Sequence, residues 1–336
     1  MYNLRFCELD EEKMLQILIG KGWKEHIFTH HSSLLRWQFY NEIERRFNIL
    51  VAHDTVNDSI VGMLGYIPVA HFDKNLADYK EYWLSHWYVD KDSCNDPTIG
   101  LGLLSKLTEY LEANSICGIG ISDVAFGIYK AMRFETGIMN HYFIPNINRK
   151  DYKILKNFKG NVTSSTVSSR LTFKRINNVR ELGYLKITLS PMKSIDYVIN
   201  RYLNHPYYKY GLNALSFKNE LLMIMVTRKI RVGELNCIRI VDILGDYSSA
   251  ENIFSLISDF LSLESSEYID CLNHGLPKEF FTTLGFEKKS GNLVIPDFFE
   301  PFVAKNVDYR FALKTKNKNF CIFKADSDRD RPYLMQ

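Results

Sequence analysis

The sequence predicts an α/β protein built from two successive units, each a mixed central sheet flanked by helices. Short β-prone segments alternate with segments whose apolar residues recur at helical spacing, and the same order of elements occurs twice along the 336 residues. The composition, with 46% hydrophobic and 24% charged residues, is that of a globular protein and excludes a mainly disordered chain. A chain of this length is expected to hold about two domains.

Helical spacing predicts four helices in the first half, over residues 9–19, 32–47, 99–111 and 125–134. Ser32 and Ser33 are N-cap candidates for the second of these helices. β-Prone runs predict strands over residues 48–53, 60–68, 82–89, 116–121 and 137–144, the first two forming a hairpin.

The second half repeats this rhythm after a polar stretch. Helices are predicted over residues 191–203, 248–263 and 279–284, and strands over residues 221–226, 237–244 and 268–272. We therefore divide the chain into a first domain over residues 1–148, a connector over residues 149–183 and a second domain over residues 184–336.

Charge and cysteine content limit the possible partners. Lys and Arg number 42 against 39 Asp and Glu, and this small excess does not predict a nucleic-acid partner. No apolar run approaches the roughly 20 residues that cross a bilayer, and the opening residues lack the apolar stretch of a secretory signal. The six cysteines have no metal-ligand spacing. We expect a cytoplasmic protein with buried, reduced cysteines, no membrane partner and no metal.

The loop between the strand over residues 82–89 and the following helix carries the clearest chemical signal. It reads Pro97-Thr98-Ile99-Gly100-Leu101-Gly102, and the helix starts at once. Glycines at a helix start let backbone N–H groups approach an anion, which the helix dipole also favours. The arrangement suits a pyrophosphate, although a simple turn is the alternative, and it is neither the dinucleotide fingerprint nor a Walker loop.

In this order of elements the first half, over about residues 48–145, resembles the GNAT acyltransferases, which transfer an acyl group from acyl-coenzyme A to an amine. Their pyrophosphate loop is commonly Gln/Arg-x-x-Gly-x-Gly/Ala, and a later helix carries Asn-x-x-Ala-x-x-x-Tyr-x-x-x-Gly-Phe. Four residues stand at matching places of that helix: Ser122, Ala125, Tyr129 and Phe134. Three residues depart from the patterns: Pro97 for Gln or Arg, Ser122 for Asn, and Arg133 for Gly.

The resemblance implies acyl-coenzyme A as co-substrate and assigns its contacts to the first half. These are Tyr88, Val89, Thr98, Ile99, Gly100, Leu101, Gly102 and Ser122. It also implies that backbone N–H groups around residues 87–89 polarise the thioester carbonyl, and that Tyr129 protonates the leaving thiolate. A packing role for Tyr129 is the alternative.

His86 is the best-placed candidate for the base that deprotonates the amine. Alternation along the strand puts His86 on the face of Leu84 and Tyr88, opposite Ser85 and Trp87. A core histidine is the alternative. Other candidates for the base are His53, His71, His141 and Asp123.

The second half resembles a degenerate copy of the same domain. Its loop, Gly245-Asp246-Tyr247, lacks the paired glycines, and the charge of Asp246 is expected to repel a pyrophosphate. Phe281 stands at the tyrosine position and offers no phenol. We expect one acyl-coenzyme A site, in the first half.

Five segments together resemble a narrower group, the tandem-GNAT N-acyltransferases of bacterial surface-polysaccharide (lipopolysaccharide or O-antigen) biosynthesis. They are residues 35–40 (LRWQFY), 62–68 (GMLGYIP), 141–144 (HYFI), 205–210 (HPYYKY) and 323–332 (FKADSDRDRP). The implied acceptor is a nucleotide-linked amino sugar, such as a dTDP-3-amino-3,6-dideoxyhexose. Its expected contacts are His141, His205, Tyr208, Lys209, Lys324, Asp326, Arg329 and Arg331.

Each of these assignments has a purely structural alternative. His141 could be a packing residue, residues 205–210 could form a solvated loop, and residues 323–332 could be a solvated run of charges. Two other functions also stay open at this point: an aminoacyl-tRNA-dependent transferase of the peptidoglycan-bridge type, and a non-catalytic GNAT pair that binds a ligand or serves as a scaffold.

Overall fold

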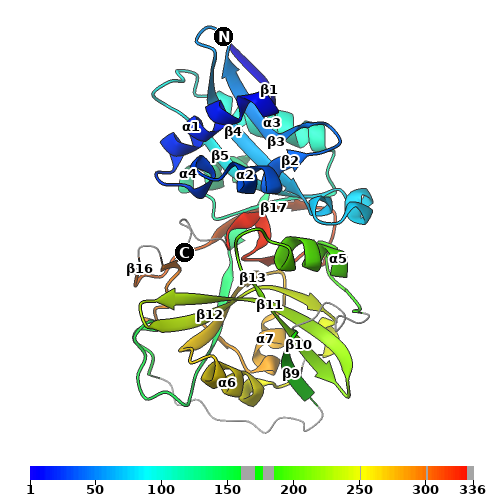
Figure 1. Ribbon diagram of the computed structural model, residues 1–336, viewed down its shortest axis with the longest axis vertical. Helices are drawn as coiled ribbons and strands as arrows, with labels where there is room; N and C mark the ends of the chain where they lie inside the picture. Colours follow the sequence, from blue (N-terminus) through cyan, green and yellow to red (C-terminus); the bar gives the residue numbers. More distant parts are fainter. Residues whose placement is uncertain (160–170, 177–184, 250, 300–301, 331–336) are drawn as a thin grey trace. The chain divides into compact units, whose positions relative to one another are not determined.

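The computed structural model describes residues 1–159, 171–176, 185–249, 251–299 and 302–330, which form two compact units (Figure 1). The first unit comprises Met1–Gly137 and Arg310–Asn317, and the second comprises Ile138–Tyr309 and Lys318–Asp330. Each unit contains a mixed sheet flanked by helices, which confirms the predicted fold class. The boundary between the compact units falls after Gly137, earlier than the predicted domain end at residue 148.

The sheet of the first unit runs in the order β1-β3-β4-β5-β6-β17-β7, with β2 beside β3. Its strands are β1 (Tyr2–Glu8), β2 (Tyr40–Asn41), β3 (Arg46–Asp54), β4 (Ser59–Pro68), β5 (Glu81–Val89), β6 (Ser115–Ile119), β7 (Glu135–Ile138) and β17 (Arg310–Thr315). β5 and β6 run parallel, whereas β3, β4 and β5 pair antiparallel in sequence.

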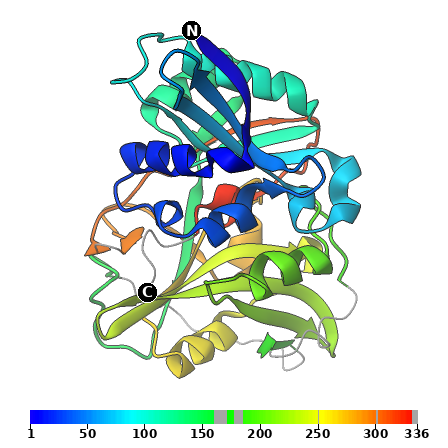
Figure 2. The same cartoon turned by 45° about the horizontal axis from the view of Figure 1, so that its top comes forward.

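Helices cover both faces of this sheet (Figure 2). α1 (Glu12–Gly22) and α2 (Ser32–Phe39) lie on one face, and α3 (Ile99–Leu111) and α4 (Asp123–Ala131) lie on the other. The predicted helix over residues 32–47 ends at Phe39, because the residues from Arg46 onward form the central strand β3, which is almost fully buried. Short 3₁₀ turns occupy Leu9–Glu11, Ile27–Thr29, Val69–His71 and Lys74–Tyr79.

Each predicted domain supplies one strand to the sheet of the other domain. The single strand predicted over residues 137–144 is two strands, β7 in the first sheet and β8 (Asn140–Pro145) in the second. β8 pairs with β13 (Tyr268–His274) of the second sheet, while β17, from the end of the chain, pairs with β6 of the first. An apolar run predicts a strand, but local pattern does not specify its partner.

The second sheet runs in the order β14-β8-β13-β12-β11-β10-β9. Its further strands are β9 (Leu171–Ile176), β10 (Gly211–Phe217), β11 (Glu220–Val232), β12 (Leu235–Gly245), β14 (Glu287–Lys288) and β18 (Ile322–Phe323), and β15 (Phe298–Phe299) pairs separately with β16 (Phe302–Val303). The predicted connector thus supplies an edge strand, β9, to the second sheet.

The first two helices of the second unit start later than predicted, whereas the third starts one residue earlier. They are α5 (Ile195–Val198), a π-helical turn (Ile199–Leu203), α6 (Phe254–Leu263) and α7 (Lys278–Leu284), with 3₁₀ turns at Tyr247–Ser249 and Asp326–Asp328. Across the described residues of both units, no helix has the length and apolar character needed to span a bilayer.

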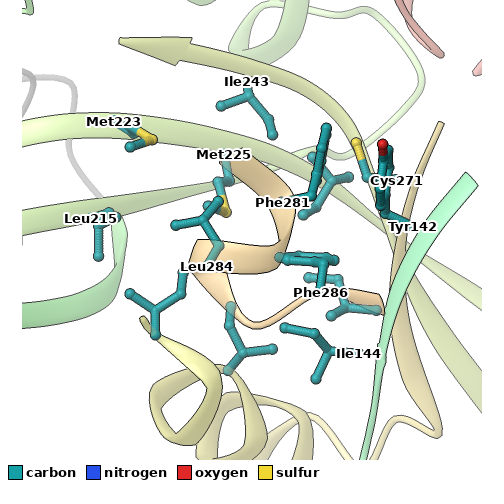
Figure 3. Packing of buried hydrophobic residues seen from close by; sticks show 14 of the residues in the cluster. Tyr142, Ile144, Leu215, Met223, Met225, Ile243, Cys271, Phe281, Leu284 and Phe286 are labelled. Carbon is teal, nitrogen blue, oxygen red and sulfur yellow. The ribbon is translucent and has the colours of Figure 1, made fainter. Parts of the chain in front are cut away.

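The core of the second unit lies between its sheet and α6 and α7 (Figure 3). Phe281 of α7 stacks on Tyr142 of β8, with ring centroids 3.9 Å apart and an interplanar angle of 7°. Phe281 is fully buried, so the residue at the expected tyrosine position packs in the core.

A gap opens in the second sheet where β12 and β13 part. These strands pair in parallel only from Ile238 to Ile240 of β12. Beyond this stretch, β18 pairs with Asn273 and His274 of β13, and the Ala325 N–H donates to the Val241 carbonyl at 2.9 Å. The chain over residues 322–325 therefore fills the space between the carboxyl ends of β12 and β13.

Truncation of Phe323 tests how strongly this filling segment contributes to the second unit. Phe323 is 2% exposed in the core, so Phe323→Ala is expected to lower the free energy of unfolding by about 3–5 kcal/mol, measured by urea denaturation. Phe302→Ala, at a residue that is 36% exposed, is the control and is expected to stay within about 0.5 kcal/mol of the parent. Equal effects of the two changes would contradict a filled gap.

Candidate functional site

The first unit contains the matching gap, between β5 and β6. The two strands pair from Glu81 and Ser115 to Leu84 and Gly118, after which β6 ends at Ile119. β5 continues to Val89, so its last five residues have no strand beside them on this edge among the described residues. Backbone N–H groups on such an edge are available to a ligand.

A β-bulge lies on β5 directly after the strands part. Gly65 of β4 is opposite Ser85, and Met63 is opposite Tyr88, so one residue of β4 faces two residues of β5. The bulge includes His86, whose φ of 53° is in the left-handed region. This backbone conformation costs a residue with a side chain about 1–3 kcal/mol, so the surroundings must stabilise it.

Because of the bulge, the side chains of β5 do not point to the faces of the sheet that regular alternation predicts. His86 and Tyr88 contact Trp23 on the side of α1 and α2, whereas Leu84 and Trp87 pack in the cluster formed with α3 and α4. The prediction that His86 shares a face with Leu84 is therefore wrong. It assumed regular alternation, which one extra residue in the strand interrupts.

His86 is enclosed by rings and is only 4% exposed. Ring centroids of four aromatic side chains lie within 5.6 Å of its own: Trp23, His26, Phe28 and Phe39. Its Nδ1 lies 2.6 Å from the Ser85 hydroxyl, and its Nε2 lies 3.3 Å from Nε2 of His26. Both ring nitrogens are thus engaged, and the role of His86 as a base stays a prediction.

The start of α3 forms the anion-binding end of the candidate site. The first helical bond runs from the Gly102 N–H to the Thr98 carbonyl at 2.8 Å. The N–H groups of Gly100 and Leu101 precede this bond and have no acceptor in the described chain. They lie at the positive end of the helix, where they favour a bound anion. Ile99 is buried and Thr98 is exposed beside them.

An aspartate sits beside this helix start in both halves. The Asp96 carboxylate accepts hydrogen bonds from the Thr98 N–H at 2.9 Å and hydroxyl at 2.7 Å, which lower the pKa of Asp96. Asp246 makes the same two bonds to Ser248 and pairs with Lys186 at 3.0 Å. The charge of Asp246 therefore does not distinguish the halves, contrary to our expectation. The differences are the later start of α6 and the filled gap.

Tyr129 of α4 places its hydroxyl where β5 and β6 separate. The hydroxyl oxygen lies 3.6 Å from the position that a Cβ of Gly118 would occupy. The Tyr129 and Trp87 rings meet edge to face at 5.4 Å, and Trp87 Nε1 lies 3.7 Å from the corresponding position at Gly100. The Trp87 side chain, which the sequence analysis did not assign, thus joins the helix start to Tyr129.

The remaining residues predicted to contact acyl-coenzyme A lie on both faces of the first sheet. Val89 lies 3.7 Å from the Cβ position of Gly100, and Ser122 caps α4 by accepting the Ala125 N–H at 3.2 Å. The Tyr88 ring lies on the opposite face, 5.5 Å from that of Trp23, so only its backbone adjoins the open edge.

In the second unit, His141 and Lys324 belong to one buried network of polar and charged groups, in which burial lowers the pKa of His141. His141 Nε2 lies 2.8 Å from Asp270, and Arg239 donates to Asp270 at 2.6 Å and also to Asp297. Lys324 donates to both oxygens of Asp297, at 2.8 and 2.9 Å. Burial lowers the pKa of Lys324 to about 8, although Asp297 opposes this shift.

Asp326 belongs to a second buried group. Lys193 lies 2.8 Å from Asp242 and 2.9 Å from Asp326, and the Tyr202 hydroxyl donates to Asp242 at 2.6 Å. One ammonium faces two carboxylates here, and burial raises the pKa of Asp326 to about 7. The alternating charges of residues 324–330 are therefore mostly buried, contrary to the solvated alternative.

The other predicted acceptor contacts are more dispersed. The His205 and Tyr208 rings stack at 4.5 Å, and burial with the nearby Arg201 lowers the pKa of His205 to about 3, so this imidazole is neutral. Lys209 is exposed and Arg329 is half-buried. Arg331 lies outside the described residues.

The buried partners of these groups were not predicted from the sequence. They are Lys193, Arg201, Arg239, Asp242, Asp270 and Asp297. Arg239, Asp242 and Asp270 carried a usable signal, since charged residues inside apolar strands are almost never buried without partners.

All six cysteines are buried thiols.

Comparison with known proteins supports the fold at low sequence identity. No family model and no curated protein matches the chain. A GCN5-related N-acetyltransferase from Anabaena variabilis is similar over 94% of this chain and 73% of its own, with 10% identity and a TM-score of 0.54. A probable N-acyltransferase from Enterococcus faecalis is similar over 93% and 72%, with 12% identity and a TM-score of 0.52. The chain therefore has the fold of GCN5-related (GNAT) N-acetyltransferases.

The raised pKa of Asp326 predicts a pH dependence of stability. Its folded pKa of about 7 exceeds the ordinary 3.8, so its stabilising contribution is present at low pH and is lost as pH rises from about 4 to about 7. Asp326→Asn is expected to flatten this part of the curve of unfolding free energy against pH, measured by urea denaturation.

The exposed Asp259→Asn is the control and is expected to leave the curve unchanged. A pH dependence that is the same in Asp326→Asn and the parent would show that Asp326 is ionised throughout this range.

Proposed function

We propose that this protein is an N-acyltransferase that moves an acyl group from acyl-coenzyme A to the amine of an acceptor. The proposed donor site lies in the first unit. The observation that carries the proposal is the open gap between β5 and β6. The unpaired N–H groups of α3 and the Tyr129 hydroxyl both lie at this gap. The corresponding gap of the second unit is filled by β18, which favours one donor site per chain.

Donor binding follows from the groups at the gap. The pyrophosphate would accept hydrogen bonds from Gly100 and Leu101, with Thr98, Ile99 and Gly102 shaping the loop around it. The pantetheine arm carries amide groups and would pair with the free edge of β5, as an added strand does. The thioester carbonyl would then meet backbone N–H groups of residues 87–89.

The reaction needs a neutral amine, a polarised thioester carbonyl and a proton donor for the leaving thiolate. The neutral amine attacks the carbonyl, the N–C bond forms, the C–S bond breaks, and the thiolate takes a proton while the amine loses one. In this proposal Tyr129 donates to the thiolate. The sequence predicts His86 as the base on the amine side, but both of its ring nitrogens are engaged, so the base is not assigned in this proposal. No acyl-enzyme is required, and burial raises the pKa of the Cys237 thiol to about 12, which suits a structural thiol.

For the acceptor we propose a nucleotide-linked amino sugar of the dTDP type. Support comes from the five sequence segments and from two features of the second unit. The His205–Tyr208 stack offers ring faces for a base, and Lys209 offers an exposed cation for a phosphate. His141, Lys324 and Asp326 are buried among charged partners of the second unit, and their contact with the acceptor stays a prediction from the sequence.

A negative charge introduced at the start of α3 tests whether acyl-coenzyme A binds there. Gly100→Glu would place a carboxylate beside the proposed pyrophosphate and is expected to weaken acetyl-coenzyme A binding by at least about 10-fold, or 1.4 kcal/mol, in calorimetry. Ser105→Glu, on the exposed face of the same helix, is the matched control and is expected to bind as the parent does.

For the parent, donor at 100 times its Kd is expected to add about 2.7 kcal/mol to the free energy of unfolding. If no acyl-coenzyme A stabilises the parent, acyl-coenzyme A is not the donor and the proposal is wrong.

Removal of one hydroxyl tests the acid. Tyr129→Phe is expected to lower kcat by about 10²-fold or more at saturating donor, because the leaving thiolate loses its proton source, and to leave donor affinity nearly unchanged. Thiol release in the presence of amino-sugar nucleotides measures this. Tyr79→Phe, which removes an exposed hydroxyl, is the control. Unchanged turnover in Tyr129→Phe would remove Tyr129 from the mechanism.

A further inference from the structure

We infer that His26 and His86 are positioning residues, which hold the bulge of β5 through one directed chain of hydrogen bonds ending at Ser85. The inference rests on the proposed function, because the bulge carries the N–H groups assigned to the thioester carbonyl. It assigns His26 and Ser85, neither of which the sequence analysis selected, and it gives His86 a role other than that of a base.

The direction of the chain follows from its first bond. The backbone N–H of Phe28 donates to Nδ1 of His26 at 3.2 Å, so this nitrogen carries no proton. Neutral His26 then has its proton on Nε2 and donates to Nε2 of His86 at 3.3 Å. His86 in turn has its proton on Nδ1 and donates to the Ser85 hydroxyl at 2.6 Å.

This direction leaves His86 without a free lone pair. Its Nε2 accepts the hydrogen bond from Nε2–H of His26, and its Nδ1 already donates to Ser85. To take a proton from an amine, His86 would have to break its bond with His26. Burial of both imidazoles also separates them from solvent, since His26 is 2% and His86 is 4% exposed.

The bulge requires such a restraint. The left-handed φ of 53° favours glycine, yet the residue is histidine. The rings of Trp23, Phe28 and Phe39 enclose the His86 side chain, and the hydrogen bonds tie both its nitrogens. The segment over residues 26–28 is thereby linked to β5 at the position where the backbone turns.

The consequence is geometric control of the site. His86 and Trp87 are the two residues of β5 that face a single residue of β4, and β5 has no partner on β6 from Ser85 onward. The bulge therefore sets where the N–H groups of Trp87 and Tyr88 point. Since misplacement of a reacting group by about 1 Å costs about 10²-fold in rate, a relaxed bulge would lower kcat.

Two substitutions at His86 separate geometry from proton transfer. His86→Gly removes the ring but accepts the left-handed backbone, whereas His86→Val removes the ring and disfavours that backbone. We expect kcat of His86→Gly to exceed that of His86→Val by at least about 10-fold, with similar KM for acetyl-coenzyme A. Equally low kcat values, with recovery of His86→Gly by added imidazole, would show that His86 is a base and overturn the inference.

Substitution of His26 provides a second, independent comparison. His26→Gln can still accept from Phe28 and donate to His86, and it is expected to retain most of kcat. His26→Phe keeps the ring volume and breaks the chain, and it is expected to lower kcat by about 10-fold at unchanged KM. If His86 were a base, His26→Phe would free its lone pair, so unchanged or higher kcat would overturn the inference.

A spectroscopic measurement works without turnover. Nitrogen-15 NMR of the parent with labelled histidines is expected to show His26 protonated at Nε2 and His86 protonated at Nδ1. The opposite tautomer of His86 would overturn the inference even if the enzyme is active. Absence of acyl-coenzyme A-dependent turnover in the parent would instead remove the proposed function, so the two failures are distinguishable.

Discussion

The separation of β5 from β6 after Leu84 and Gly118 is the constraint on which the account of the first unit depends. A parallel pair that parts inside a sheet leaves backbone donors without a strand, and such an edge binds an extended group that offers amides and a carbonyl. The bulge at His86 turns this edge, α3 supplies unpaired N–H groups beside it, and Tyr129 ends at the point of separation. Each feature alone is common in α/β proteins, and the proposed acyl-transfer site rests on their combination.

The second unit shows what happens when the same gap is occupied by the chain itself. β18 pairs with β13 in the gap, and buried ion pairs hold the residues that follow it, with Lys324 on Asp297, Asp326 on Lys193 and Asp330 on Arg201. Buried ion pairs add little net stability over apolar contacts, but loss of one partner is costly. They therefore favour a single position of this segment, which keeps the gap closed.

Local sequence signals predicted the elements around the site well. The helix start at Ile99 and the strand over residues 82–89 agree with the structure to within one residue, because glycines, aromatic runs and helical spacing act locally. The bulge was not predictable, since it arises from pairing with β4, and it reversed the expected face of His86. The burial of Asp326 and Asp330 was also missed, because their partners, Lys193 and Arg201, lie more than a hundred residues earlier. The exchange of β8 and β17 was missed for the same reason.

The central claim is that one acyl-coenzyme A binds each chain at the gap between β5 and β6. A crystal structure of the protein with acetyl-coenzyme A tests this most directly. We expect the pyrophosphate at the N–H groups of Gly100 and Leu101, and the thioester carbonyl within hydrogen-bonding distance of a backbone N–H of residues 87–89. Density for the pantetheine arm in the second unit beside β12, or on any other surface with the first gap empty, would contradict it.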